Sequence, residues 1–435
     1  MKDICVEIVE KAKKLGADGA IATGSESTGR QIKFANNKIA RTSLEKDKHV
    51  ELFLSIGKKT GETLINVNGD IEQQVSLFVQ LVKKLPDNPE FNGVAVGKYA
   101  YSEVASFDSK IAAGEEFVEI LNSALDKCSD VRSGGIFETS VDETYLVSSD
   151  GPIAEHKSTS VYFSIRCLAD QAASGHKVAC DNFIDKMNYA GLVQSARELA
   201  LKSRNPTKGQ QGVYNVVFDA FPFAALLDPF VNSTSVFSVE SGLSALAGKI
   251  GQKVASDLIT LTDDPTRRGA FCATPFDAEG FPTRSVPIVE KGVLKTYLHN
   301  SSTAKKYGVQ STGHAGISSP HPWNPVLSPG NSKLDELIRE AKNGIFISNI
   351  WYTRFQNYST ADFSTIPRDA IMLIENGELT RPIREIRISD NLLGILSRAK
   401  LLSSDQRQIY GWEVETPIFA CDALVENVGI TTPQG

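Results

Sequence analysis

Two short segments in the second half of the chain place a glycine-containing turn between apolar runs. They read 288-IVEKGVLKTYL-298 and 373-LIENGELTRPI-383. A two-residue turn between antiparallel strands needs positive φ angles, which Lys-Gly and Asn-Gly supply. Both segments therefore predict tight β-hairpins, either as an internal repeat or as convergent turn chemistry. Because most other Gly- and Pro-marked motifs also lie in this part, we predict a β-rich C-terminal domain over residues 211–435.

The first ninety residues combine helical and strand-like patterns. Apolar residues recur at helical spacing in two segments, 4–15 and 71–85. Two strand-like segments, 49–57 and 62–67, lie between them and are separated by a glycine-containing turn. We therefore predict an α+β domain over residues 1–90. A Pro-, Asn- and Gly-rich stretch marks its end.

A second unit follows over residues 91–210. Its predicted helices are 114–128 and 188–203. Its predicted strands are 131–138, 143–149, 159–168 and 176–180. The run 159-TSVYFSIRC-167 alternates polar and apolar residues, as a strand with one solvated face should. The predicted class is therefore α+β and multi-domain, with N-terminal α/β units before the β-rich domain.

Composition excludes several classes of protein. With 435 residues the chain exceeds the size at which a single core keeps growing. The net charge of −6 and the lack of a dense basic run argue against nucleic-acid binding. No apolar segment reaches the roughly 18 residues that a membrane-spanning helix needs. The six cysteines include no CxxC pair, which is typical of reduced thiols, so we expect a cytoplasmic protein.

Common catalytic motifs are missing from the sequence. No two of the six histidines have the i, i+3 to i+5 spacing that presents two zinc ligands from one helix. P-loop, GxGxxG and GxSxG patterns are also absent, and SxxK recurs along the chain, for example at Ser43/Lys46, Ser302/Lys305 and Ser397/Lys400, which shows that chance supplies this pattern often. A metal site assembled from distant segments stays open.

The loop 274-TPFDAEGFPT-283 holds a pair of carboxylates in a rigid setting. Asp277 and Glu279 precede a glycine and lie between two prolines. Paired carboxylates can transfer protons or bind a cation. Alternatively, Asp277 forms an Asx turn and Glu279 forms a salt bridge, and neither residue contacts a substrate.

The stretch 224-AALLDPFVNSTSVFS-238 raises a different question. It is apolar enough to form a buried helix, yet it contains Asp228, Pro229, Asn232 and Ser233. Proline in a helix interior costs roughly 3 kcal/mol. We therefore predict that the helix begins at Pro229, with Asp228 as its N-cap.

Several of these segments together resemble the TldD/PmbA family, most closely its PmbA (TldE) branch. The segments that carry the resemblance are 29-GRQIKFANNKI-39, the TPFDAEG loop, IVEKGVLKTYL, 311-STGHAG-316, 370-AIMLIENGELTRPIREIRIS-389 and 391-NLLGIL-396. The resemblance implies a metallopeptidase system that trims or degrades peptides, known for microcin maturation and for removing an antitoxin.

In that family the TldD subunit carries an HExxxH helix and a further Cys ligand, and PmbA pairs with it without an intact metal site. Alignment through Leu226-Leu227 and 235-SVFS-238 places Asp228 at the first histidine, Pro229 at the glutamate and Ser233 at the second histidine. Zinc needs imidazole or thiolate ligands and a nearby base, and this set supplies neither. Cys421 lies in the region of the expected cysteine, but its surroundings favour a strand residue.

The resemblance thus implies a subunit with no cofactor and no catalytic residue of its own. Zinc is expected in a TldD-like partner, and unfolded peptides are the expected substrates. Asp277, Glu279 and His314 are candidates for a substrate or subunit contact. Two alternatives stay open. One is an active metallopeptidase with a rearranged site drawn from those residues, Asp228 and Cys421; the other is a homodimeric peptide-binding protein.

Overall fold

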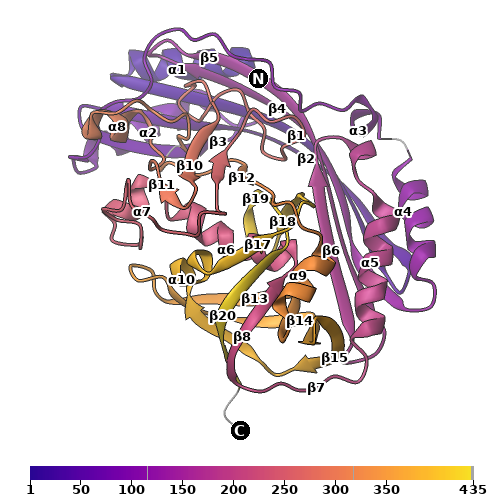
Figure 1. Cartoon of the computed structure of the whole chain (residues 1–435). Helices are drawn as coiled ribbons and strands as arrows, with labels where there is room; N and C mark the ends of the chain where they lie inside the picture. The colour runs from indigo at the N-terminus through magenta and orange to yellow at the C-terminus, as the bar shows by residue number, and fades with distance from the viewer. Residues whose placement is uncertain (115, 317, 433–435) are drawn as a thin grey trace.

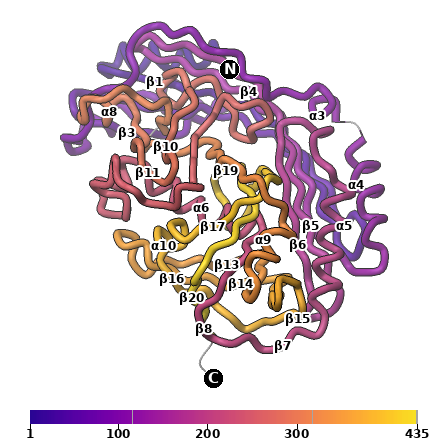
Figure 2. Tube along the Cα trace, viewed as in Figure 1, coloured from indigo at the N-terminus to yellow at the C-terminus, as the bar shows by residue number. Residues whose placement is uncertain are grey.

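The structure, a computed structural model, describes residues 1–432 except residues 115 and 317. It contains three sheets (Figure 1). The first sheet is antiparallel throughout. Its strands, in spatial order, are β3 (Lys59–Ile65), β2 (Lys38–Ile56), β1 (Gly19–Ala35), β4 (Arg132–Ser148), β5 (Ile153–Leu168) and β6 (Ser174–Asp181). In Figure 2 its indigo-to-purple strands form an arc, and the C-terminal part of the chain lies inside that arc.

Strand β1 joins the two N-terminal units into one sheet. It pairs with β2 on one side and with β4 on the other. The strands on either side of the predicted boundary near residue 90 therefore share a single sheet. The two predicted strands 131–138 and 143–149 are wrong as separate elements, because β4 runs without a break from Arg132 to Ser148. Pairing with β1 and β5 on its two edges keeps the polar middle of β4 extended.

Four helices cover one face of this sheet in two groups. They are α1 (Lys2–Lys14), α2 (Ile71–Lys84), α4 (Phe117–Leu125) and α5 (Tyr189–Lys202). Ala20 and Ala22 of β1 pack in the core with α1 and α2, whereas Ile32 and Phe34 pack in the core with α4 and α5. Side chains two residues apart on a strand point to the same face. Residue 115, in the predicted helix 114–128, lies outside the described residues. The other three helices predicted within residues 1–210 agree with the structure within two residues.

The opposite face of the first sheet contacts the C-terminal part of the chain. Ile21 of β1 and Phe53 of β2 pack with Phe276, which lies in the loop 274–283. The first sheet therefore has helices on one face and the loop of the candidate carboxylates on the other. One further short helix, α3 (Ser109–Ala113), precedes α4 in the chain.

The C-terminal part contains the other two sheets, both mixed. The second sheet has the order β11 (Val293–Leu294), β10 (Val286–Glu290), β9 (Leu261–Asp263), β12 (Pro325–Leu327), β19 (Val414–Ala420) and β18 (Arg407–Gly411). The third has β13 (Gly344–Asn357), β8 (Gly212–Phe218), β20 (Ala423–Thr431), β16 (Arg387–Asn391), β14 (Asp362–Glu375), β15 (Glu378–Arg384) and β7 (Thr207–Lys208), with β17 (Ala399–Leu402) paired to β20.

Both predicted hairpins are confirmed. β10 and β11 flank the turn Lys291-Gly292, and β14 and β15 flank Asn376-Gly377. All four turn residues have positive φ, between 46° and 81°. The predicted α+β, multi-domain class with a β-rich C-terminal part is also confirmed.

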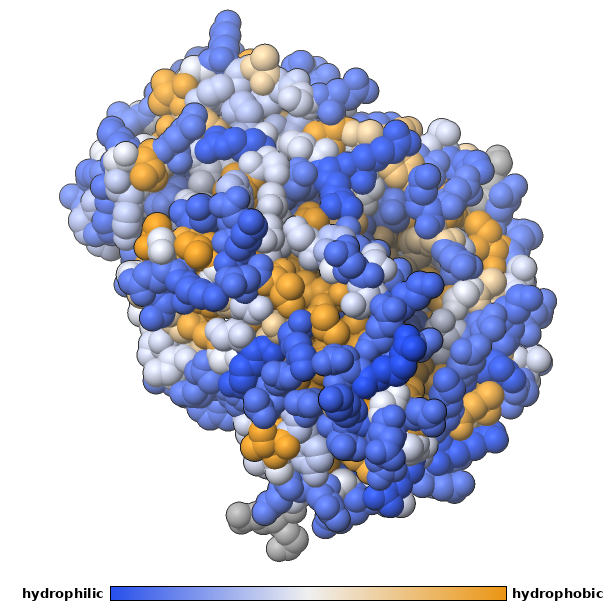
Figure 3. Space-filling model, in the orientation of Figure 1, coloured by the Kyte–Doolittle hydropathy of each residue, from blue (hydrophilic) through white to orange (hydrophobic). Residues whose placement is uncertain are grey.

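Helix α6 (Ala220–Asn232) packs between the second and third sheets, against β19 and β13. The remaining α-helices of the described residues are α7 (Val236–Glu240), α8 (Ser301–Tyr307), α9 (Leu334–Ala341) and α10 (Leu392–Ser397). The space-filling view shows apolar side chains gathered near the middle of the visible face, with polar side chains around them (Figure 3). No helix in the described part of the chain is long and apolar enough to cross a bilayer.

Candidate functional site

Helix α6 begins nine residues earlier than the sequence predicts. It starts at Ala220, and its N-cap is Asp219, whose Oδ1 accepts a hydrogen bond from the Ala220 backbone N–H at 2.7 Å. The prediction that the helix begins at Pro229 with Asp228 as N-cap is wrong. Pro229 lies inside the helix. Almost every side chain of α6 is buried, and this apolar burial offsets the roughly 3 kcal/mol cost of the proline.

Asp228 is buried near the C-terminal end of α6 and is held by neighbours from two segments. Its Oδ1 accepts hydrogen bonds from the Thr416 backbone N–H and from Asn232 Nδ2, both at 3.1 Å. Asn232 Nδ2 also lies 3.1 Å from Thr416 Oγ1, so these three residues join α6 to β19. Burial raises the pKa of Asp228 to about 6.

The raised pKa of Asp228 predicts that its charge destabilises the folded protein. Ionisation of Asp228 costs more in the folded state than in the unfolded state, so its unfavourable contribution to the free energy of unfolding grows between about pH 4 and about pH 6. Above about pH 6 this contribution remains constant. Asp228→Asn keeps an acceptor for Thr416 and should raise the free energy of unfolding at pH 7 by up to about 3 kcal/mol. Urea unfolding at pH 4 and pH 7 measures this. An equal gain at both pH values would show that the charge is not the cause, and Asp228→Ala, which lacks the acceptor, should not stabilise.

The other residues at the aligned positions do not fit a zinc site. Pro229 has no side-chain donor atom, and Ser233 Oγ donates to the Phe230 carbonyl at 2.7 Å. Cys421 lies beyond the other end of α6, because its neighbour Asp422 accepts a hydrogen bond from the Ala220 N–H. Along the helix axis this end is about 12 Å from Asp228. Burial raises the pKa of the Cys421 thiol to about 11.

No cluster of three or more His, Cys, Asp or Glu side chains within residues 1–114, 116–316 and 318–432 has a geometry that could hold a metal ion. Asp228, Cys421 and the loop carboxylates are therefore not brought together. A pocket of about 410 Å³ does open beside Asp228, Pro229 and Ser233. Its walls include Phe355 and Leu393 and no imidazole.

Asp277 forms the Asx turn that the sequence suggests. Its Oδ1 accepts hydrogen bonds from the backbone N–H groups of Glu279 and Phe281, both at 3.0 Å. Its Oδ2 accepts from the Ala315 N–H at 3.0 Å and so fixes the loop 311–316 against the loop 274–283. Asp277 is 1% exposed, so its side chain organises the two loops and is out of reach of a substrate.

Glu279 makes no salt bridge with any described residue, contrary to the alternative considered above. Its Oε2 accepts a hydrogen bond from the Ser301 N–H at 3.2 Å, at the start of α8. Burial raises the pKa of Glu279 to about 7. Unlike Asp277, this side chain lines a pocket.

His314 is completely buried, and its ring nitrogens face other residues of the chain. Its Nδ1 lies 2.9 Å from the Thr312 carbonyl, which identifies Nδ1 as the protonated nitrogen. Its Nε2 is 3.6 Å from Asp263 Oδ2 and has no hydrogen-bond partner among the described residues. Asp263 itself accepts hydrogen bonds from the Trp323 and Asn324 N–H groups. His314 therefore belongs to the packing of these loops.

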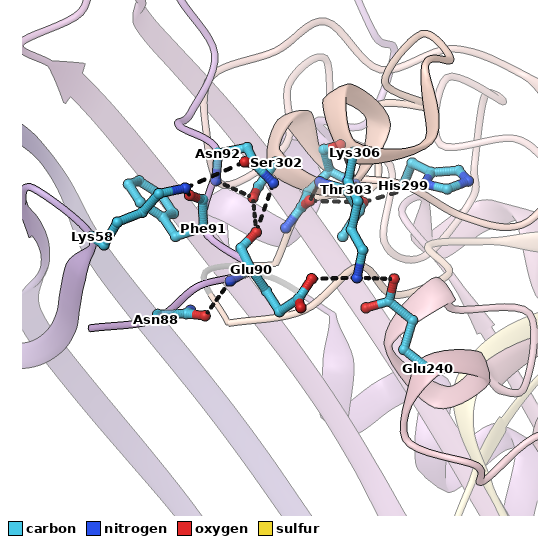
Figure 4. A network of polar contacts seen from close by, with 11 residues as sticks. Lys58, Asn88, Glu90, Phe91, Asn92, Glu240, His299, Ser302, Thr303 and Lys306 are labelled. Atoms are coloured by element: carbon cyan, nitrogen blue, oxygen red, sulfur yellow. Dashed lines mark hydrogen bonds and ion pairs between the residues drawn. The ribbon is translucent and has the colours of Figure 1, made fainter. Parts of the chain in front are cut away.

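The pocket beside Glu279 is the larger of the two, with a volume of about 680 Å³. We call it the junction pocket; it lies where β1, β2 and β3 face α7, α8 and the linker 88–94. Lys306 of α8 bridges Glu90 of the linker and Glu240 of α7, at 2.8 Å from the latter (Figure 4). Ser302 Oγ donates to the Glu90 carbonyl at 3.0 Å and accepts from the Asn92 N–H at 2.8 Å, so the linker is fixed to α8.

The sequence did not indicate Glu90, Glu240 or Lys306 as functional residues. None of them belongs to a catalytic or ligand-binding motif, and more than sixty residues separate any two of them. Only the approach of the first sheet to the C-terminal part brings them together, and a single sequence contains no local signal for that contact.

Two parts of the chain match the sequence profiles of one protein family. Residues 211–432 match the PmbA/TldA metallopeptidase C-terminal domain, which is more than half of the chain. Residues 101–204 match the PmbA/TldA metallopeptidase central domain. The chain belongs to the PmbA/TldD family. The predicted resemblance is thereby confirmed.

The curated relatives match only part of the chain. A metalloprotease of Methanocaldococcus jannaschii is 30% identical over 51% of this chain and 50% of its own length. A PmbA homologue of Haemophilus influenzae, also named a metalloprotease, is 32% identical over 46% of this chain and 43% of its own length. The chain thus spans about half the length of these curated relatives.

Solved structures share the fold over nearly the whole chain. TldE from Thermococcus kodakarensis has a TM-score of 0.88 and 20% identity, and the match covers 98% of this chain and 100% of that one. A Thermotoga maritima crystal structure has a TM-score of 0.88 and 23% identity, with 99% of each chain covered. This PmbA/TldD family member therefore has a TldE-like fold.

Proposed function

We propose that this chain is the metal-free subunit of a two-subunit cytoplasmic peptidase whose partner is a TldD-like chain that carries zinc. In the complex, this subunit completes the wall of a chamber and holds unfolded peptide for the partner to cleave. The observation that carries the proposal is the donor set at the end of α6. Asp228 is occupied by Thr416 and Asn232, Ser233 is bonded to its own helix, and Pro229 cannot accept a proton.

Family membership supports the peptidase part of the proposal, and the TldE-like fold supports the choice of subunit. Asp277 and His314 are buried between loops. A substitution of either residue would therefore affect a subunit contact only through the conformation of those loops. Glu279 stays a candidate for contact with substrate because it lines the junction pocket.

Metal analysis tests the metal-free part directly. The purified chain is dialysed first against zinc and then against metal-free buffer. Elemental mass spectrometry is expected to find far less than one zinc ion per chain. Asp228→Ala should leave that content unchanged, because a single carboxylate without imidazoles binds zinc weakly. Stoichiometric zinc that disappears in Asp228→Ala would overturn the metal-free assignment.

Assembly tests the partner part. The chain and a TldD-like protein encoded by the same organism are co-expressed, with an affinity tag on one of them. We expect both chains in one peak on size exclusion, with zinc in proportion to the TldD-like chain. Two separate peaks at micromolar concentration of each chain would contradict the proposal.

A further inference from the structure

Strand β3 is an edge strand with a free side. It pairs with β2, and no other strand in the described part of the chain pairs with it. The β2–β3 hairpin closes at the pair Ile56–Lys59 through the two-residue turn Gly57-Lys58. In an antiparallel hairpin of this length the closing pair is hydrogen-bonded, and hydrogen-bonded pairs then alternate along the strands.

This alternation identifies the free backbone groups. Lys59, Gly61, Thr63 and Ile65 bond to β2, so Thr60, Glu62 and Leu64 direct their N–H and C=O groups away from the sheet. Within the described residues these outward groups accept and donate no backbone hydrogen bond elsewhere. An edge of this kind is a template for a further strand.

Two pockets lie along the same edge. The junction pocket is lined by Thr60, Gly61 and Glu62, and a second pocket of about 470 Å³ is lined by Glu62, Thr63 and Leu64. Ser318 lines both pockets and its Oγ donates to Glu62 Oε2 at 2.9 Å. Space for the side chains of an added strand therefore exists on both sides of Glu62.

Register directs one of those side chains into the junction pocket. Ile21, Phe53 and Glu62 are directly opposite one another across β1, β2 and β3. Residues opposite each other in a sheet point to the same face, and Ile21 and Phe53 both line the junction pocket. A residue of an added strand that pairs with Glu62 would therefore point into that pocket as well.

The junction pocket has an excess of negative charge. Three carboxylates (Glu62, Glu90 and Glu240) and the acid Glu279, whose pKa is raised to about 7, line it. The only cation that lines it among the described residues is Lys306, which is already paired with Glu90 and Glu240. Glu62 and Glu279 have no described basic partner within 4 Å. The apolar walls formed by Ile21, Phe53 and Phe237 suit an aliphatic stem. A long aliphatic side chain with a cationic head matches both features.

We propose that the free edge of β3 binds an extended peptide as an additional strand, and that the junction pocket receives a Lys or Arg side chain of that peptide. This inference rests on the proposed function in that the occupant is a peptide substrate. It adds to the proposed function a binding site on this subunit and a preference for peptides with a basic residue opposite Glu62.

Binding of short fluorescent peptides to the isolated full chain tests the inference. The probes are Thr-rich peptides with Lys, norleucine or Glu at the centre, together with a Lys peptide that is N-methylated at alternate amides. At low ionic strength we expect the Lys peptide to bind about tenfold more tightly than the Glu peptide, with norleucine between them. N-methylation should abolish binding because it removes the backbone donors that pair with β3.

Variants locate the site. Glu62→Lys should weaken binding of the Lys peptide about tenfold and reverse the preference, so that the Glu peptide binds more tightly. The reason is that the charge of an exposed side chain at the proposed contact changes from negative to positive. Glu45→Lys is the matched control, since Glu45 is an exposed residue of the neighbouring strand β2 outside the junction pocket. It should leave both affinities unchanged.

Four results would overturn the inference. The first three are equal affinity for the Lys and Glu peptides, full binding of the N-methylated peptide, and equal effects of Glu62→Lys and Glu45→Lys. A fourth is loss of peptide binding in proportion to added TldD-like protein, which would assign the β3 edge to the partner. Because binding is measured on the isolated chain, its failure leaves the assembly and zinc results of the proposed function untouched. Likewise, charge-selective binding without assembly would reject the proposed complex and keep the site.

Discussion

Hydrolysis of an unfolded fluorescent peptide is expected to be at background level with this chain alone and at least about a thousandfold faster when a TldD-like partner is added. The isolated chain has no base at Pro229, and Asp228 is held by Thr416 and Asn232. A partner with an intact metal site would supply what these residues lack. The measurement is the initial rate against the ratio of the two chains, which should saturate at a fixed stoichiometry.

The control for this prediction is the same mixture with a chelator, or with a partner whose metal-binding histidines are replaced by alanine. Both should return the rate to background. If the isolated chain cleaves peptide and a chelator abolishes that cleavage, the chain has a metal site of its own and the non-catalytic assignment fails. Asp228→Ala protein purified in parallel separates this result from contamination, because a contaminating host peptidase would be unaffected.

Asp219→Ala is expected to destabilise the protein by about 3 to 5 kcal/mol, because it removes one partner of a buried charge network. Asp219 is 3% exposed and contacts Lys177 Nζ and, at 3.1 Å, Arg407 Nη1. Burial alone would raise the pKa of Asp219, but Lys177 and Arg407 lower it to about 2. The stability that the carboxylate contributes is therefore present above about pH 4 and is lost as the pH falls toward 2.

Urea unfolding at pH 7 measures this loss, and Asp405→Ala is its matched control. Asp405 also pairs with Arg407, at 3.4 Å, but its side chain is 72% exposed. Removal of such an exposed partner should change the free energy of unfolding by no more than about 1 kcal/mol. Comparable losses in the two variants would mean that burial is not what makes the Asp219 pairs important.

Local signals predicted the elements that local chemistry determines. The hairpins at Lys291-Gly292 and Asn376-Gly377 follow from positive φ angles in two-residue turns, and the Asx turn at Asp277 follows from a side chain that reaches the backbone two residues on. These interactions involve neighbouring residues, so the sequence contains all of their determinants.

Elements that depend on distant partners were predicted less well. The continuous β4 needs β1 and β5 on its two edges, and the early start of α6 needs the second and third sheets around it. A proline penalty calculated from the sequence omits the burial that offsets it at Pro229. The charge lining of the junction pocket was missed for the same reason, since Glu62, Glu90 and Glu240 meet only in the folded chain.

The double pairing of β1 limits how the chain can be divided. A fragment that ends near residue 90 would retain β1 and β2 but lose β4, which pairs with β1 over residues 21–35. The exposed edge would offer a row of unsatisfied backbone groups to any other strand, and such edges promote aggregation. Proteolytic nicking within 86–93 should therefore leave two pieces that stay associated until the protein is denatured, and expression of the first piece alone should give insoluble material.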